Sequence, residues 1–206
     1  MIDNRKLIIP LLEFPKPGDT FYFIQILQRK KDNKNNDISN GLFGSNNNSR
    51  LIKAYYITKK EDVDKYWEEM VAIANLFKSR ISINLNPRSF EKTAYKTISK
   101  MAHQMENRDF YNIRRAYNTA CGEYQSEIDK RWIVDIDDLD TDNLQNIINN
   151  IKNLYSYNLS DKNYKILAIL PSKSGYHIIC NPFNIPGMTQ KSIEIHKNNP
   201  TNLYIP

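Results

Sequence analysis

A short apolar run that ends in two carboxylates constrains the fold of this chain most. The run is Trp132–Asp137, with the order Trp-Ile-Val-Asp-Ile-Asp. Successive side chains of a β-strand point to opposite faces of a sheet, so Asp135 and Asp137 would point together while Val134 and Ile136 face a core. Adjacent carboxylates repel each other unless a cation lies between them, and Mg²⁺ or Mn²⁺ suits such oxygen ligands. The alternative is a strand that runs into an acidic turn, since three more Asp residues follow by residue 142.

Two later segments carry groups that suit phosphate or metal binding. Pro171–Cys180 places Ser, Lys, Ser and Gly between two strand-like runs, which is typical of a hairpin turn. Its hydroxyls, backbone N–H groups, lysine and the imidazole of His177 can bind phosphate oxygens. Farther along, Ile193 and Ile195 flank Glu194 in an alternating strand. If the two isoleucines face a core, Glu194 faces the opposite side, toward the Asp pair.

The order of these segments resembles the three motifs of the archaeo-eukaryotic primase superfamily. The matching segments are I-V-D-I-D, S-K-S-G-Y-H, and I-E-I followed by N-L-Y-I-P, which span about residues 130 to 206. The resemblance implies that Asp135, Asp137 and Glu194 are catalytic residues and ligands of two Mg²⁺ or Mn²⁺ ions. It also implies that the second motif binds the incoming nucleotide through Ser172, Lys173, Ser174 and His177.

The resemblance implies an α+β fold, a two-lobed primase-like catalytic core with an RRM-like C-terminal sheet. We expect a single catalytic domain over residues 1–206. Its N-terminal α/β lobe would cover about residues 1–128, and the RRM-like lobe with the metal site would cover about residues 129–206. A chain of 206 residues and 24.2 kDa is the right size for one such domain.

The sequence departs from the family motifs in two ways. The third motif usually carries Asp where this chain has Glu194, and the sequence stops a few residues later, where many relatives continue. Many relatives also carry a zinc-binding insertion. The two cysteines and three histidines here show no CxxC or comparable ligand spacing, so no zinc site is expected.

The rest of the chain reads as strands and amphipathic helices. Strands are expected at about 21–28, 51–57 and 80–85, with a polar loop over about 30–50. Asn86-Pro87-Arg88 ends the third strand, and Ser89 can cap the helix that follows. Candidate nucleic-acid contacts are Arg88, Arg114 and Arg115. The alternatives are a turn with an exposed arginine and a solvated helix face.

Composition sets weaker limits. The net charge is +6 and the pI about 9.1, which is compatible with a polyanionic partner. No apolar run is long enough to span a membrane and no signal peptide is evident, so a cytoplasmic location is expected.

The leading hypothesis is a DNA primase or primase–polymerase of a small phage or plasmid type. It would use a single-stranded DNA template and NTP or dNTP, together with a separate helicase or other replication protein. One alternative is a catalytically inactive primase-fold protein that binds nucleic acid, and a weaker one is a metal-dependent nuclease. The second motif separates the leading hypothesis from the nuclease, because a triphosphate-binding turn is expected of a polymerase and not of a nuclease.

Overall fold

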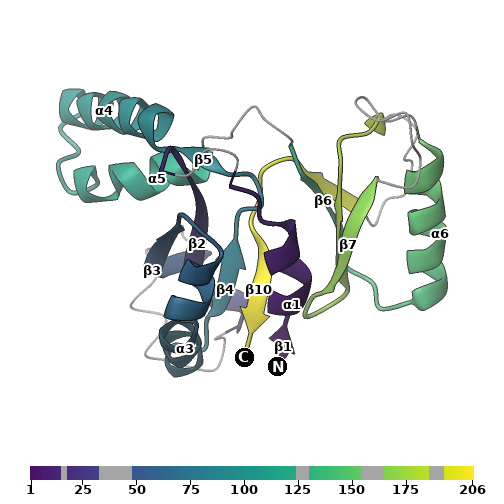
Figure 1. The fold of residues 1–206 in the computed structure, drawn as a ribbon. Helices are drawn as coiled ribbons and strands as arrows, with labels where there is room; N and C mark the ends of the chain where they lie inside the picture. The colour runs from purple at the N-terminus through teal and green to yellow at the C-terminus, as the bar shows by residue number, and fades with distance from the viewer. Residues whose placement is uncertain (15–17, 33–47, 124–129, 155–164, 186–192) are drawn as a thin grey trace.

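Two antiparallel β-sheets with helices packed around them form an α+β fold, which confirms the predicted fold class at this level (Figure 1). The computed structural model describes residues 1–14, 18–32, 48–123, 130–154, 165–185 and 193–206. Most of the predicted loop over 30–50 lies outside these residues.

The first sheet contains the strands expected in the N-terminal half. Its members are β1 (Ile2–Asp3), β2 (Thr20–Arg29), β3 (Ser49–Ile57), β4 (Arg80–Ile83), β5 (Arg88–Ser89) and β10 (Thr201–Ile205). The order is β1-β10-β4-β2-β3, with β5 paired to the start of β2. The short helices α1 (Arg5–Ile8), η1 (Ile9–Leu11) and η2 (Lys30–Asp32) accompany this sheet.

Helix α3 (Glu61–Leu76) follows β3 and contributes to the core of the first sheet. Val63, Met70 and Ala74 are fully buried, as their spacing on one helix face predicts. The sequence Thr58-Lys59-Lys60-Glu61 fits a capping box, but the helix starts differently. The carboxylate of Asp62 instead accepts hydrogen bonds from the backbone N–H and the hydroxyl of Thr58.

The second sheet is built from β6 (Trp132–Ile136), β7 (Ile166–Pro171), β8 (Tyr176–Cys180) and β9 (Ile193–His196), in the order β7-β8-β6-β9. Helix α6 (Thr141–Asn153) covers one face, and the side chain of Asp140 caps it by accepting from the N–H of Asp142. Val134 and Ile136 pack with the buried isoleucines of α6. Ile133 and Ile179, on the opposite face, join the core of the first sheet. The two sheets therefore share a hydrophobic core.

The last strand corrects the predicted lobe boundary. Residues 129–206 were expected to form the second lobe, but β10 pairs with β4 and with β1 in the first sheet. All five of its residues are buried. Their burial is explained by neighbours on both strand edges and both faces, so the second sheet ends at β9 and the chain returns to the first sheet.

Helices α4 (Phe90–Glu106) and α5 (Ala116–Glu123), joined through η3 (Ile113–Arg115), lie together at one end of the molecule beyond β5 (Figure 1). Ser89 caps α4 as predicted, because its hydroxyl accepts from the N–H of Lys92. The apolar residues of this amphipathic helix do not form a core face, since Ile98 and Met105 are more than half exposed.

Candidate active site

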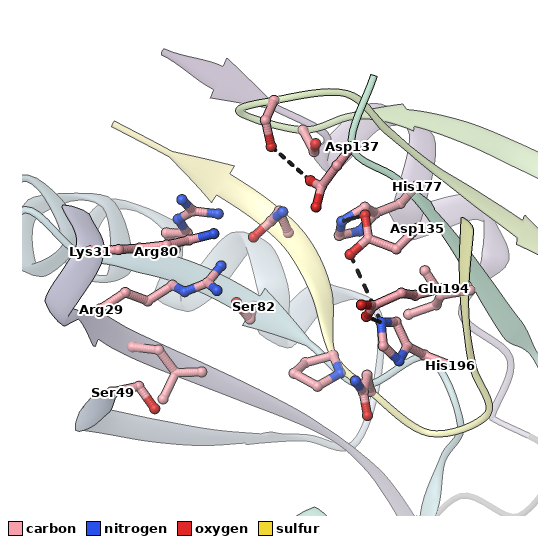
Figure 2. Close-up of a pocket in the computed structure, with 17 residues that line it drawn as sticks. Arg29, Lys31, Ser49, Arg80, Ser82, Asp135, Asp137, His177, Glu194 and His196 are labelled. Carbon is pink, nitrogen blue, oxygen red and sulfur yellow. Dashed lines mark hydrogen bonds and ion pairs between the residues drawn. The ribbon is translucent and has the colours of Figure 1, made fainter. Parts of the chain in front are cut away.

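A cavity of about 360 Å³ lies between the two sheets. Its lining includes side chains from β2, β4, β6, β8 and β9, together with the connection from β9 to β10. Figure 2 shows two walls of unlike charge. The acidic wall is formed by Asp135, Asp137 and Glu194, and the basic wall by Arg29, Lys31 and Arg80.

Register places the centre of the acidic wall. Asp135 on β6 lies directly opposite His177 on β8 and directly opposite Glu194 on β9. Cross-strand partners point to the same face of a sheet, so these three side chains share the face turned toward the cavity. The alternation expected around Glu194 is thus present, and Ile193 and Ile195 face the core on the α6 side.

The imidazole of His177 lies between Asp135 of the acidic wall and Thr201 of β10. His177 Nε2 lies 3.3 Å from Asp135 Oδ1, and His177 Nδ1 lies 2.8 Å from the hydroxyl of Thr201 on β10. The hydrogen bond with His177 is the main cause that lowers the pKa of Asp135, and it outweighs the opposite effect of burial. Asp135 is therefore an anion at neutral pH.

His196 belongs to this site, although the sequence motifs did not point to it. Its Nε2 lies 3.4 Å from Glu194 Oε2 and 3.9 Å from Asp135 Oδ2, and the residue lines the cavity. The signal that could have found it is the i, i+2 spacing from Glu194, since that spacing puts both side chains on one face of a strand.

The Ser172–Gly175 turn packs against the end of β6. The N–H of Ser172 donates to the carbonyl of Gly175 at 2.8 Å, and the hydroxyl of Ser174 donates to Asp137 Oδ1 at 2.9 Å. A Cβ added to Gly175 would lie 1.8 Å from the carbonyl oxygen of Ile136. Glycine is therefore required for this close approach, which brings the predicted phosphate-binding turn beside Asp137.

Substitution of this glycine is expected to damage both stability and activity. Gly175→Ala should lower the free energy of unfolding by about 1–3 kcal/mol, because the backbone must move to admit the methyl group. The same movement should displace Asp137 and reduce by about 10-fold or more any activity that depends on this carboxylate. Gly122→Ala in α5 is the control, since no atom lies within 4 Å of the added methyl. Equal melting temperatures and rates for the two variants would contradict this account of the turn.

Lys173 lies on the turn but does not line the cavity. Its Nζ is 2.9 Å from Asp32 Oδ1, and its side chain is more than half exposed. Asp32 also accepts two hydrogen bonds from the guanidinium of Arg80, at 2.7 and 2.8 Å. The structure therefore connects Lys173 to the basic wall through Asp32, and its predicted contact with nucleotide stays a prediction.

Asp32 should make stability depend on pH. Burial alone would raise its pKa, but the hydrogen bonds and charges of Arg80 and Lys173 lower the pKa from 3.8 to about 2. Because the folded-state pKa is the lower one, the stabilisation is complete above about pH 4 and is lost as the pH falls toward 2. Asp32→Asn should lower the free energy of unfolding by about 2 kcal/mol at pH 7. Urea unfolding at several pH values should show this difference narrowing below pH 4, and a constant difference would contradict the pairing.

The three arginines proposed from sequence as nucleic-acid contacts have different outcomes. Arg88 is fully buried, and it donates to the carbonyls of Cys121 and Asn86 and to the side-chain oxygen of Asn198. Its assignment as a nucleic-acid contact is therefore wrong for this structure, and so is the alternative of an exposed arginine. Arg114 and Arg115 are exposed in η3 beside the ring of Tyr111 and do not line the cavity. Their role stays a prediction.

The acidic wall has the donor chemistry that Mg²⁺ or Mn²⁺ requires, with Asp135, Asp137 and Glu194 as the oxygen ligands. In the part of the chain that the structure describes, no three His, Cys, Asp or Glu side chains already form a group that could hold a metal. The Glu194 side chain is 79% exposed, so it can change rotamer without disturbing the core. A metal would therefore bind with reorientation of this side chain.

Comparisons with known proteins found no match among family models, curated proteins or solved structures. Among the described helices, none combines the length and apolar character needed to cross a bilayer.

Proposed function

We propose that this chain is a nucleotidyltransferase of the primase–polymerase type. It would transfer a nucleotide from NTP or dNTP to the 3′-hydroxyl of a primer or first nucleotide paired with a single-stranded DNA template, and it would release pyrophosphate. The observation that carries the proposal is the cross-strand set of Asp135, His177 and Glu194, with Asp137 and the Ser172–Gly175 turn beside it. This set faces a cavity whose opposite wall is cationic.

The second sheet supports the proposal at the level of topology. Its β7-β8-β6-β9 order puts the first and third of its strands in the centre, and α6 covers the face away from the carboxylates. That arrangement is what the resemblance to an RRM-like catalytic sheet requires. The sequence motifs and the strand order both support the proposal.

The chain's own residues would position the reactants. His177 holds the Asp135 carboxylate and is itself fixed by Thr201, so the acidic wall is oriented before substrate enters. Ser172 and Ser174 line the cavity next to Asp137. The hydroxyl of Ser172 can donate to a phosphate oxygen, and the hydroxyl of Ser174 can do so by turning away from Asp137 Oδ1. Most of the rate enhancement in phosphoryl transfer comes from such positioning and from electrostatics.

Divalent ions would complete this site. Asp135, Asp137 and Glu194 would hold them, and bound ions would lower the pKa of the attacking hydroxyl and neutralise charge on the phosphates. In the cell, we propose that the protein acts in the cytoplasm with a separate helicase or other replication protein.

The proposal is tested by incubating the protein with labelled NTPs or dNTPs, single-stranded DNA and Mg²⁺ or Mn²⁺. Products are resolved by length. Labelled products longer than one nucleotide support nucleotidyl transfer. Shortened DNA would indicate the nuclease alternative. DNA binding with neither product would indicate a catalytically inactive primase-fold protein.

A further inference from the structure

We infer that Arg29, Lys31 and Arg80 form an anion subsite on the first sheet that binds the phosphate chain of a nucleotide. The sequence motifs did not point to these residues, which come from β2, η2 and β4. The choice of a nucleotide as ligand rests on the proposed function, whereas the existence of the anion subsite rests on the cavity alone.

The positions of the three cations carry the inference. All three line the cavity, and they face the carboxylates of Asp135 and Asp137 across it (Figure 2). Burial is the main cause that lowers the pKa of Arg29, and the charge of Arg80 lowers it further, while the carboxylates of Asp32, Asp135 and Asp137 act in the opposite direction. Like charges that are partly removed from water raise each other's free energy, and an anion bound between them offsets that cost.

Arg80 is oriented for such a ligand before it arrives. Its Nε and Nη2 donate to the two carboxylate oxygens of Asp32, and little of either side chain is exposed. Lys173 binds the same carboxylate from the Ser172–Gly175 turn. The Ser172–Gly175 turn and the basic wall are thus joined through Asp32 before a ligand binds. Binding of an anion therefore costs little conformational entropy of these side chains.

Cavity size favours a phosphate chain over an extended nucleic-acid backbone. A volume of about 360 Å³ suits a small-molecule ligand. Three cations grouped around it match the several charges that a triphosphate concentrates in one place, while a single strand carries one charge per nucleotide. Hydroxyl and amide groups of Ser49, Ser82 and Asn202 also line the cavity and can donate to phosphate oxygens.

Calorimetric titration with tripolyphosphate, in EDTA and at low salt, tests the subsite without any need for turnover. Arg29→Ala and Lys31→Ala should each weaken binding by about 10-fold or more, because a charge-assisted hydrogen bond is lost. Lys96→Ala is the matched control, since it removes the same charge from the exposed surface of α4. Asp135→Asn should tighten metal-free binding by removing a repulsive charge. If Arg29→Ala fails to fold, Arg29→Lys replaces it in the titration. This variant keeps the charge and should retain most of the affinity for tripolyphosphate.

Parallel titrations with a single-stranded oligonucleotide identify the source of the phosphate. Tripolyphosphate affinities of Arg29→Ala and Lys31→Ala that match that of Lys96→Ala would overturn the inference. So would a loss of oligonucleotide affinity with tripolyphosphate binding unchanged, which would assign the wall to the template. If tripolyphosphate binds as expected but no nucleotide is incorporated, the subsite stands and the proposed function fails.

Discussion

Replacement of Asp135 or Asp137 by Asn is expected to abolish nucleotide transfer while the fold survives. Each change removes one negative charge from the acidic wall but keeps the shape of the side chain. Loss of a single preorganised electrostatic group in an active site typically costs at least about 100-fold in rate. Incorporation of labelled nucleotide should therefore fall by at least that factor with either Mg²⁺ or Mn²⁺.

The fold should tolerate these two changes because neither residue supports the core. The Asp135 side chain is 28% exposed, and an amide oxygen can still accept from His177. We expect melting temperatures within about 4 °C of the wild type, which corresponds to about 1 kcal/mol in a chain of this size. Asp142→Asn, at the exposed start of α6, is the charge-matched control and should keep full activity. Wild-type rates for Asp135→Asn in Mn²⁺ would remove this residue from catalysis.

Arg88→Met is expected to destabilise the protein by about 3–5 kcal/mol, because three acceptors, two of them buried carbonyls, lose their donor, and to lower the melting temperature by about 10 °C. Burial lowers the pKa of Arg88 to about 10, so the guanidinium stays charged at neutral pH. Its hydrogen bonds join the segment after β4 to α5 and to Asn198. Asn198 precedes Asn199 and Pro200, which line the cavity. The substitution should therefore also disturb this part of the cavity lining.

Arg115→Met provides the control for this prediction. Arg115 is exposed in η3, and surface substitutions of this kind usually change stability by less than about 0.5 kcal/mol. Thermal unfolding of both variants, with single-strand affinity measured in parallel, separates a structural role from a contact with DNA. An unchanged melting temperature for Arg88→Met with lost DNA affinity would contradict the structural role.

The local features of the second sheet could be predicted because alternation is a property of neighbouring residues. The pattern around Asp135 and around Glu194 indicates which side chains face the core. What alternation cannot give is register, and register is what places Glu194 and His177 opposite Asp135. His196 was missed although the same alternation, carried two residues beyond Glu194, points it to the same face.

The remaining errors concern contacts between residues far apart in the sequence. β10 is a short, fully buried strand, and its sequence does not reveal which of the two sheets it joins. The residues of the basic wall come from β2, η2 and β4, more than fifty residues before β6 in the sequence. They face the carboxylates across the cavity only in the folded chain. Arg88 looked like a surface residue because arginine is rarely buried without a carboxylate partner.

Nucleotide selection on homopolymer templates tests the central claim most directly. Labelled ATP or dATP and labelled UTP or dTTP are offered in turn on oligo(dT) and oligo(dA), with Mn²⁺ and with Asp135→Asn as the catalytic control. Template-directed transfer predicts that the wild type incorporates only the complementary nucleotide on each template and that the variant incorporates neither. Absence of incorporation by the wild type on both templates, or incorporation independent of the template, would contradict it.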